Sequence, residues 1–160
     1  MFNTETKSAD KHTLQLRSPA LRLWIRLARA FRAIEEAAAR DVARHGLTLA
    51  EFGMLEAIHH LGPMPLGEIQ RKILVSSGGV TYVADSLEKR GLIRRDTSDS
   101  DRRVRIAVLT GEGEELIRSI FPEHGRMLEE TMSGLDPDEQ EEAASLIRRL
   151  GLRAAQNEEK

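Results

Sequence analysis

Three arginines and two aspartates lie close together in residues 99–105, whose sequence is Asp-Ser-Asp-Arg-Arg-Val-Arg. An arginine at the tip of a hairpin can enter a narrow minor groove of duplex DNA, where the electrostatic potential is most negative. A nearby carboxylate can hold the guanidinium in that pose, and Asp101 and Arg103 have the spacing for it. We therefore expect DNA contacts from Arg102, Arg103 and Arg105, with Asp101 orienting Arg103. A solvated charged hairpin is the alternative, because a charge run alone does not specify DNA.

Hydroxyl-bearing and small residues gather before this run, in residues 76–82, whose sequence is Ser-Ser-Gly-Gly-Val-Thr-Tyr. Hydroxyl groups can donate to phosphates or base edges, and glycines let the backbone approach phosphates at the positive end of a helix. One face of this helix is apolar and should pack on the core: Val80, Val83, Ala84 and Leu87. The expected DNA contacts on its other faces are Ser76, Ser77, Gly78, Thr81 and Tyr82. An ordinary surface helix with a Ser/Gly cap is the alternative when this helix is considered without the basic run.

Capping residues and apolar periodicity indicate the helices that must position these groups. Pro19 is suited to a first helical position, Thr48 and Glu51 form a capping box, and Gly91 suits a helix end that needs positive φ. The pattern predicts helices over residues 19–44, 48–62, 66–73 and 77–90.

Two strands and two further helices should follow. Residues 92–97 and 103–109 are rich in Val, Ile and Thr and flank a polar turn at residues 98–102. Thr110 caps the next helix, which we expect to be kinked or broken near Pro122. A second capping box, at Asp136, opens the last helix, whose apolar face comprises Ala143, Leu146, Ile147 and Leu150.

This order of elements predicts a mainly α fold with a small β-wing. Three short helices with tight turns, followed by a hairpin, form a winged helix-turn-helix over residues 47–110. Residues 1–16 are expected to be a flexible arm. Residues 17–46 and 111–156 are expected to form a helical dimerisation region, because long apolar-striped helices near the termini often make subunit contacts.

Composition narrows the class of protein. The net charge is −2, but it is unevenly distributed: residues 1–67 carry +2, residues 68–111 carry +3 and residues 112–160 carry −7. The middle third is thus the expected contact surface for a polyanion. The chain contains no cysteine, which excludes disulfides and thiolate metal sites, and it contains no apolar run of membrane length. We expect a cytoplasmic protein with no membrane partner.

The remaining candidate groups are weaker. The sequence lacks a Gly-rich phosphate loop, a nucleophile–base spacing and a metal set, so we expect no enzyme activity and no cofactor. Glu56, His59 and His60 offer too few ligands on one helical turn for a metal site. Trp24, Phe31 and Phe52, together with His59, are candidates for an effector pocket; the alternative is that the aromatic residues are simply core.

Several motifs together resemble the MarR family of bacterial transcriptional regulators. They are Asp85-x-Leu87-Glu-x-Arg90-Gly91-Leu, then Asp101-x-Arg103, then Leu109-Thr110, within a segment matching the family over roughly residues 47–113. Residues 73–85 and 120–124 are more similar to the branch of methylhydroquinone-responsive repressors. Many members have a basic residue where this chain has Tyr82.

The resemblance implies a homodimer that binds a palindromic operator on double-stranded DNA. It also implies that Arg103 enters the minor groove, that Asp101 supports it, and that a small, often aromatic or phenolic, effector binds between the dimer helices and the DNA-binding region. We expect a repressor of this type. A winged-helix protein-interaction module without effector binding is the alternative, and it would be favoured by an apolar outer face on the helix that carries Thr81 and Tyr82.

Overall fold

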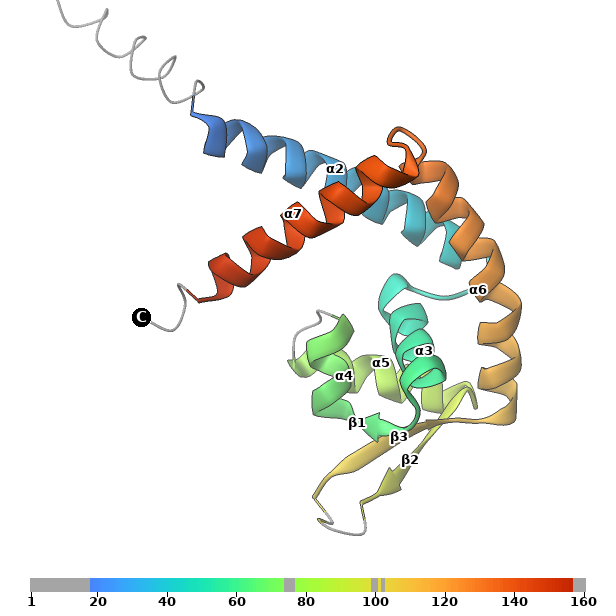
Figure 1. Cartoon of the computed structure of the whole chain (residues 1–160). Coiled ribbons are helices and arrows are strands. Elements are labelled where there is room, and N and C mark those ends of the chain that lie inside the picture. The colour runs from blue at the N-terminus through green and yellow to red at the C-terminus, as the bar shows by residue number, and fades with distance from the viewer. Residues whose placement is uncertain (1–17, 74–76, 99–100, 102, 157–160) are drawn as a thin grey trace, which may run out of the picture.

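The computed structural model describes residues 18–73, 77–98, 101 and 103–156. Its elements in chain order are α2 (Pro19–Ala43), α3 (Leu49–Leu61), β1 (Met64–Pro65), α4 (Leu66–Ile73), α5 (Ser77–Lys89), β2 (Ile93–Thr97), β3 (Arg105–Leu109), α6 (Gly111–Met132) and α7 (Pro137–Ala155). Figure 1 shows α3, α4, α5 and the three strands gathered into one lobe, with α2, α6 and α7 lying along and beyond it. The predicted winged helix-turn-helix architecture is confirmed.

The starts of α3 and α7 and the end of α5 agree with the predicted caps. The Thr48 side chain accepts from the Glu51 backbone N–H while the Glu51 carboxylate accepts from the Thr48 N–H, and Asp136 and Glu139 repeat the arrangement at α7. Gly91 has a φ of 72°, which is the left-handed conformation needed just beyond α5. These local signals begin or end three of the helices.

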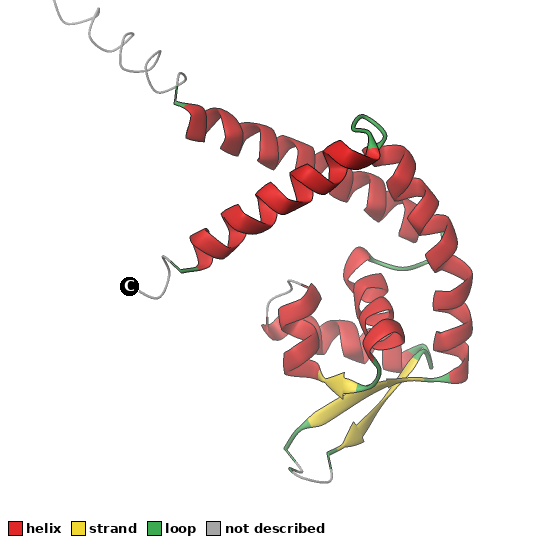
Figure 2. Cartoon of the chain, in the orientation of Figure 1, coloured by secondary structure: helices red, strands yellow, loops and turns green. Residues whose placement is uncertain are grey.

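The three strands form an antiparallel sheet in the order β1-β3-β2 (Figure 2). Ile93 lies opposite Leu109 and Thr97 opposite Arg105, so β2 and β3 form the hairpin of the wing. The two-residue strand β1 pairs with β3 through Met64 and Ala107. This strand was not predicted, because two residues carry no periodicity and their partners on β3 lie 43 and 41 residues further along the chain.

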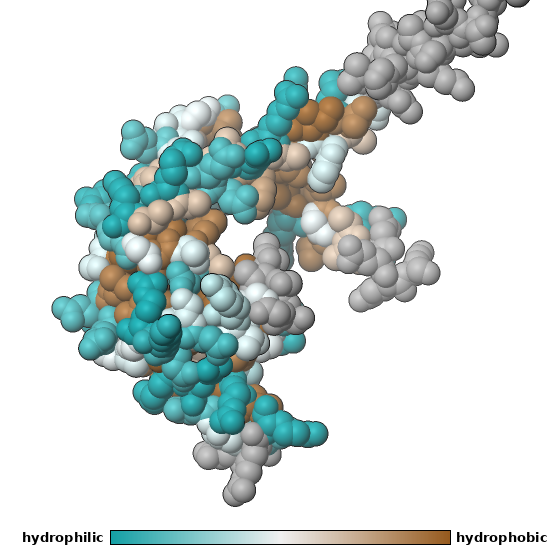
Figure 3. Space-filling model, turned by 180° about the vertical axis from the view of Figure 1, so that it is seen from behind, coloured by the Kyte–Doolittle hydropathy of each residue, from teal (hydrophilic) through white to brown (hydrophobic). Residues whose placement is uncertain are grey.

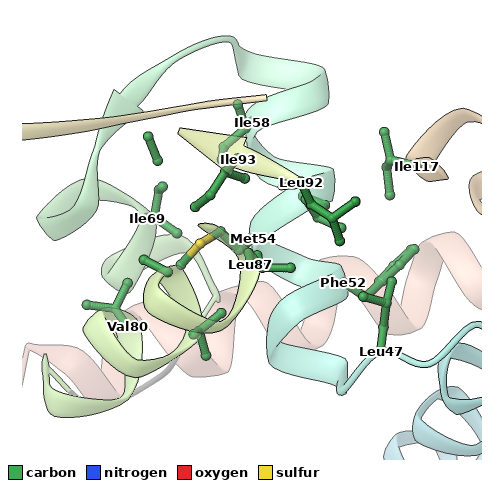
Figure 4. Packing of buried hydrophobic residues seen from close by; sticks show 14 of the residues in the cluster. Leu47, Phe52, Met54, Ile58, Ile69, Val80, Leu87, Leu92, Ile93 and Ile117 are labelled. Carbon is green, nitrogen blue, oxygen red and sulfur yellow. The ribbon is translucent and has the colours of Figure 1, made fainter. Parts of the chain in front are cut away.

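One apolar cluster holds the lobe together. Its fully buried members come from α2, α3, α4, α5, β2, β3 and α6 and include Met54, Leu55, Ile69, Leu87, Ile93 and Ile117. Figure 4 shows side chains of this cluster, among them Met54, Ile69 and Leu87, meeting between the helices and the sheet. Because Leu87 and Val80 of α5 are part of the cluster, the opposite face of α5 is held outward.

Helix α6 links this lobe to the terminal helices. It packs against both α3 and α2, and it runs from Gly111 to Met132 with Pro122 inside it. Of the expected kink or break near Pro122, the break is wrong because the helix continues through the proline, and the helix is visibly curved (Figure 1). Proline removes one backbone donor, but buried Ile117, Ile120 and His124 on both sides of it anchor the helix to its neighbours.

Candidate DNA-binding surface

Helix α5 presents the predicted polar groups to solvent. Tyr82 is 76% exposed and Thr81 is exposed, whereas Val80, Val83 and Leu87 are buried. The two faces of the helix are thus separated as the apolar spacing predicts. Ser77 and Gly78 belong to the first turn of α5, and Ser76 lies outside the described residues.

In the wing, the Asp101 carboxylate holds Arg103. Arg103 Nε donates to Asp101 Oδ1 at 3.1 Å, Arg103 Nη2 donates to Asp101 Oδ2 at 3.1 Å, and the Arg103 backbone N–H donates to Oδ1 at 2.9 Å. These bonds hold the pKa of Asp101 below its usual value. The Arg103 side chain nevertheless stays 91% exposed, so the pair orients a guanidinium that is free to meet a ligand.

Of the other two wing arginines, Arg105 lies in the described part of the chain. Arg105 Nη1 donates to Thr97 Oγ1 at 2.7 Å across the β2–β3 pair, and its side chain lies on the exposed face of β3. Arg102 lies outside the described residues. Arg103 and Arg105 are therefore both presented by the hairpin that extends away from the lobe (Figure 1).

A buried carboxylate joins α3 to α5. Glu51, besides closing its capping box, accepts a hydrogen bond of 2.6 Å from Ser86 Oγ, and it lies 3.6 Å from Arg90 Nη1. Burial raises the pKa of Glu51, but the hydrogen bonds from Ser86 and Thr48 outweigh burial and the pKa is lowered. Glu51 thus stays ionised and ties the C-terminal half of α5 to the start of α3. The sequence reveals the capping box but not Ser86, which lies 35 residues away.

The four candidate effector-pocket residues are dispersed over the chain. Trp24 and Phe31 are 65% and 59% exposed on α2, whereas Phe52 is buried in the core. His59 Nδ1 lies 3.1 Å from Glu114 Oε2, between α3 and α6. The position of Phe52 fits the core alternative, while Trp24 and Phe31 have no such explanation within one chain.

A second buried pair lies where α2 crosses α6. His124 Nδ1 donates to Asp41 Oδ2 at 2.9 Å, and the His124 ring packs on Phe52 with 4.5 Å between centroids. Arg44 also donates to Asp41. The contact between the two was not predicted from the sequence, because 83 residues separate them and no local pattern marks it.

The terminal helices carry an exposed apolar surface. Leu23 and Trp24 of α2 and Leu146, Ile147 and Leu150 of α7 are each 43–65% exposed. A cavity of about 500 Å³ between the two helices is lined by five apolar residues and two arginines: Leu23, Leu27, Leu146, Ile147, Leu150, Arg149 and Arg153. Figure 3 shows hydrophobic residues gathered around the terminal helices, in contrast to the mostly hydrophilic wing. A soluble monomer rarely leaves so much contiguous apolar surface uncovered.

The described part of the chain holds neither a cluster of metal ligands nor a membrane-spanning helix. Within residues 18–73, 77–98, 101 and 103–156, no group of three or more His, Asp or Glu side chains is arranged to hold a metal ion. In the same ranges, none of the helices has the length and apolar character needed to cross a membrane.

Comparison with known proteins identifies the family. The MarR family model matches residues 47–104. The HTH-type transcriptional regulator MhqR of Bacillus subtilis is 41% identical over 137 residues, covering 86% of this chain and 94% of MhqR. This match agrees with the branch that the motifs indicate.

Solved structures share the fold at lower identity. A MarR-family regulator of Streptomyces coelicolor, Sco3205 in complex with DNA, superimposes with a TM-score of 0.75 at 23% identity, over 81% of this chain and 83% of that one. BpsR of Bordetella bronchiseptica, whose DNA binding is regulated by 6-hydroxynicotinic acid, gives a TM-score of 0.74 at 24% identity, over 81% and 98%. With its match to MhqR over nearly that protein's whole length, the chain belongs to the MarR family of DNA-binding transcriptional regulators, a family that is not enzymatic.

Proposed function

We propose that this regulator is a homodimeric repressor that acts in the cytoplasm on a palindromic operator and is released from it by a small aromatic effector. The observation that carries the DNA-binding part is the exposed Arg103 guanidinium held by Asp101 at the wing, beside a helix whose outer face presents Thr81 and Tyr82. Base contacts from α5 would specify the sequence, and the wing would fix the protein on the backbone and in the minor groove.

We assign residues 47–110 to DNA binding and residues 17–46 and 111–156 to the dimer contact; the expected arm, residues 1–16, lies outside the described residues. The exposed apolar side chains of α2 and α7 support the dimer, since a second copy would remove them from water. Two symmetric lobes would then address half-sites about 34 Å apart, one turn of the duplex.

The DNA-binding part is tested with a duplex enriched from a random pool by the purified protein. Arg103→Ala should weaken its binding roughly 5- to 150-fold and reduce the slope of log affinity against log salt by about one unit. Asp101→Ala should weaken it less, because the guanidinium survives without its support. Unchanged binding by Arg103→Ala across salt concentrations would show that the wing does not reach the DNA.

The dimer and the effector need separate measurements. Light scattering at micromolar concentration should give twice the chain mass, and a monodisperse monomer would refute the dimer.

The effector is proposed from the family resemblance, and the fold shared with BpsR supports it. Simple phenols and hydroquinones should release bound duplex in a competition assay; if the whole series leaves the complex intact, the aromatic effector is wrong.

A further inference from the structure

Arg95 of the wing strand β2 contacts two carboxylates of α5. Its Nη1 lies 2.6 Å from Asp85 Oδ1, its Nε donates to Glu88 Oε2 at 2.9 Å, and its backbone N–H donates to Glu88 Oε1 at 3.2 Å. Its Nη2 also donates to Glu88. The Arg95 side chain is only 24% exposed, so these bonds are partly shielded from water.

The two acceptors continue the DNA-facing part of α5. Thr81, Asp85 and Glu88 follow one another at spacings of four and three residues, which places them along one side of the helix. Thr81 lies at the N-terminal end of this row, and the two carboxylates lie where α5 meets the wing. Glu88, Arg95 and Arg105 line a cavity of about 350 Å³.

Charge explains why these carboxylates need a partner. The Arg95 guanidinium beside Glu88 holds the pKa of that carboxyl below its usual value, with a smaller contribution from Arg105. Ionised carboxylates next to a DNA phosphate repel it unless a cation compensates them. Arg95 supplies that charge and links the helix to the strand in the same contact.

We propose that Arg95 is a positioning residue that sets the wing against α5, so that Thr81 and Tyr82 can meet base edges while Arg103 enters the minor groove of the same duplex. This inference rests on the proposed DNA contacts of α5 and the wing. Without Arg95, each element could still touch DNA, but the two would no longer be held at one mutual angle.

The neighbouring Arg94 is a matched control. It lies on the same strand and carries the same charge, but its ion pair is with Asp96, two residues along β2, at 3.1 Å from Nη2 to Oδ2. It is 57% exposed. Arg94→Gln and Arg95→Gln therefore remove the same charge from the same strand. The first frees one carboxylate of β2 itself, whereas the second frees both carboxylates of α5 and so breaks the link between β2 and α5.

The experiment measures operator affinity for Arg103→Ala in three backgrounds: wild type, Arg94→Gln and Arg95→Gln. In the wild-type and Arg94→Gln backgrounds, we expect Arg103→Ala to reduce operator affinity about tenfold or more. In Arg95→Gln, whose wing is no longer set against α5, the same change should cost about twofold or less, because contacts that depend on one another are not additive. Arg95→Gln alone should weaken operator binding more than Arg94→Gln does. Both substitutions should weaken binding to random-sequence DNA equally.

The outcomes separate this inference from the proposed function. If Arg103→Ala costs nothing in the wild type, the wing contact itself fails. If it costs the same in all three backgrounds, the wing contact holds and the positioning role of Arg95 is refuted. Circular dichroism and thermal melting establish that each variant is folded. Should Arg95→Gln not fold, Glu88→Gln tests the same link from the α5 side, with the same loss of additivity expected and full additivity refuting it.

Discussion

The buried contact between Asp41 and His124 is expected to be a main stabiliser of the junction between α2 and α6. The Asp41 side chain is 2% exposed and the His124 side chain 7%, so both groups have lost nearly all contact with water. The His124 ring also packs on Phe52 of α3. The pair thus joins the terminal helices to the lobe that carries the DNA-binding surface.

The cost of removing Asp41 follows from this burial. Asp41→Ala leaves the His124 Nδ1 without its acceptor and Arg44 without its buried partner, and an interior polar group stripped of its partner costs about 1–3 kcal/mol. Because the Arg44 side chain is 66% exposed and can turn to solvent, we expect a loss of about 1–3 kcal/mol in the free energy of unfolding.

Chemical denaturation at pH 7, followed by circular dichroism at constant protein concentration, measures this loss. Glu123→Gln is the matched control, since Glu123 sits beside His124 on α6 but is 53% exposed and 3.8 Å from His45 Nε2. It should change stability by less than about 0.5 kcal/mol. If Asp41→Ala also stays within that margin, the pair contributes no net stability and the reasoning from its burial is refuted.

Three further predictions concern base contact, packing and pH. Thr81→Ala and Tyr82→Ala should reduce the ratio of operator affinity to scrambled-duplex affinity, by roughly 5- to 150-fold for a good base contact. Ser77→Ala should instead weaken binding to both duplexes equally, and competition binding distinguishes these cases. Gly113→Ala should destabilise by about 1–3 kcal/mol in thermal or urea unfolding, because a Cβ there would lie 1.9 Å from the Leu92 carbonyl oxygen, while Gly111→Ala, with open space around it, should be neutral or stabilising. The pKa values of Asp41 and Glu51 are lowered in the folded state, so these two carboxylates stabilise the fold above about pH 4, and this stabilisation is lost as the pH falls below that value. The urea midpoint of unfolding should therefore decrease as the pH is lowered from 6 to 3, and a constant midpoint would contradict this.

The features predicted correctly from the sequence are those encoded within a few residues. Thr48 with Glu51, and Asp136 with Glu139, identify helix starts because donor and acceptor lie within one turn. The pairing of Asp101 with Arg103 was likewise predictable, since two residues separate them. Contacts such as Asp41 with His124 depend on the folded chain and leave no local trace.

The aromatic residues show a different limit. Phe31 and Phe52 both lie at apolar helical positions, yet Phe31 is 59% exposed and Phe52 is 2% exposed. Apolar periodicity shows that one face of a helix is apolar, but it does not distinguish a face that is buried within the chain from one that is left exposed on its surface. For that reason the sequence identified these residues as a group, and only the structure separates core from uncovered surface.

Two buried contacts connect the terminal helices to the helix that carries the expected base contacts. Glu51 ties α3 to α5 through Ser86, and His124 ties α6 to α2 through Asp41 while packing on Phe52, the residue that follows Glu51 on α3. A shift of α2 or α6 would therefore act on α3, and through Glu51 on the helix that carries Thr81 and Tyr82. A ligand bound between the terminal helices and the lobe could alter DNA affinity by this route if it favoured one arrangement of α2 and α6 over another.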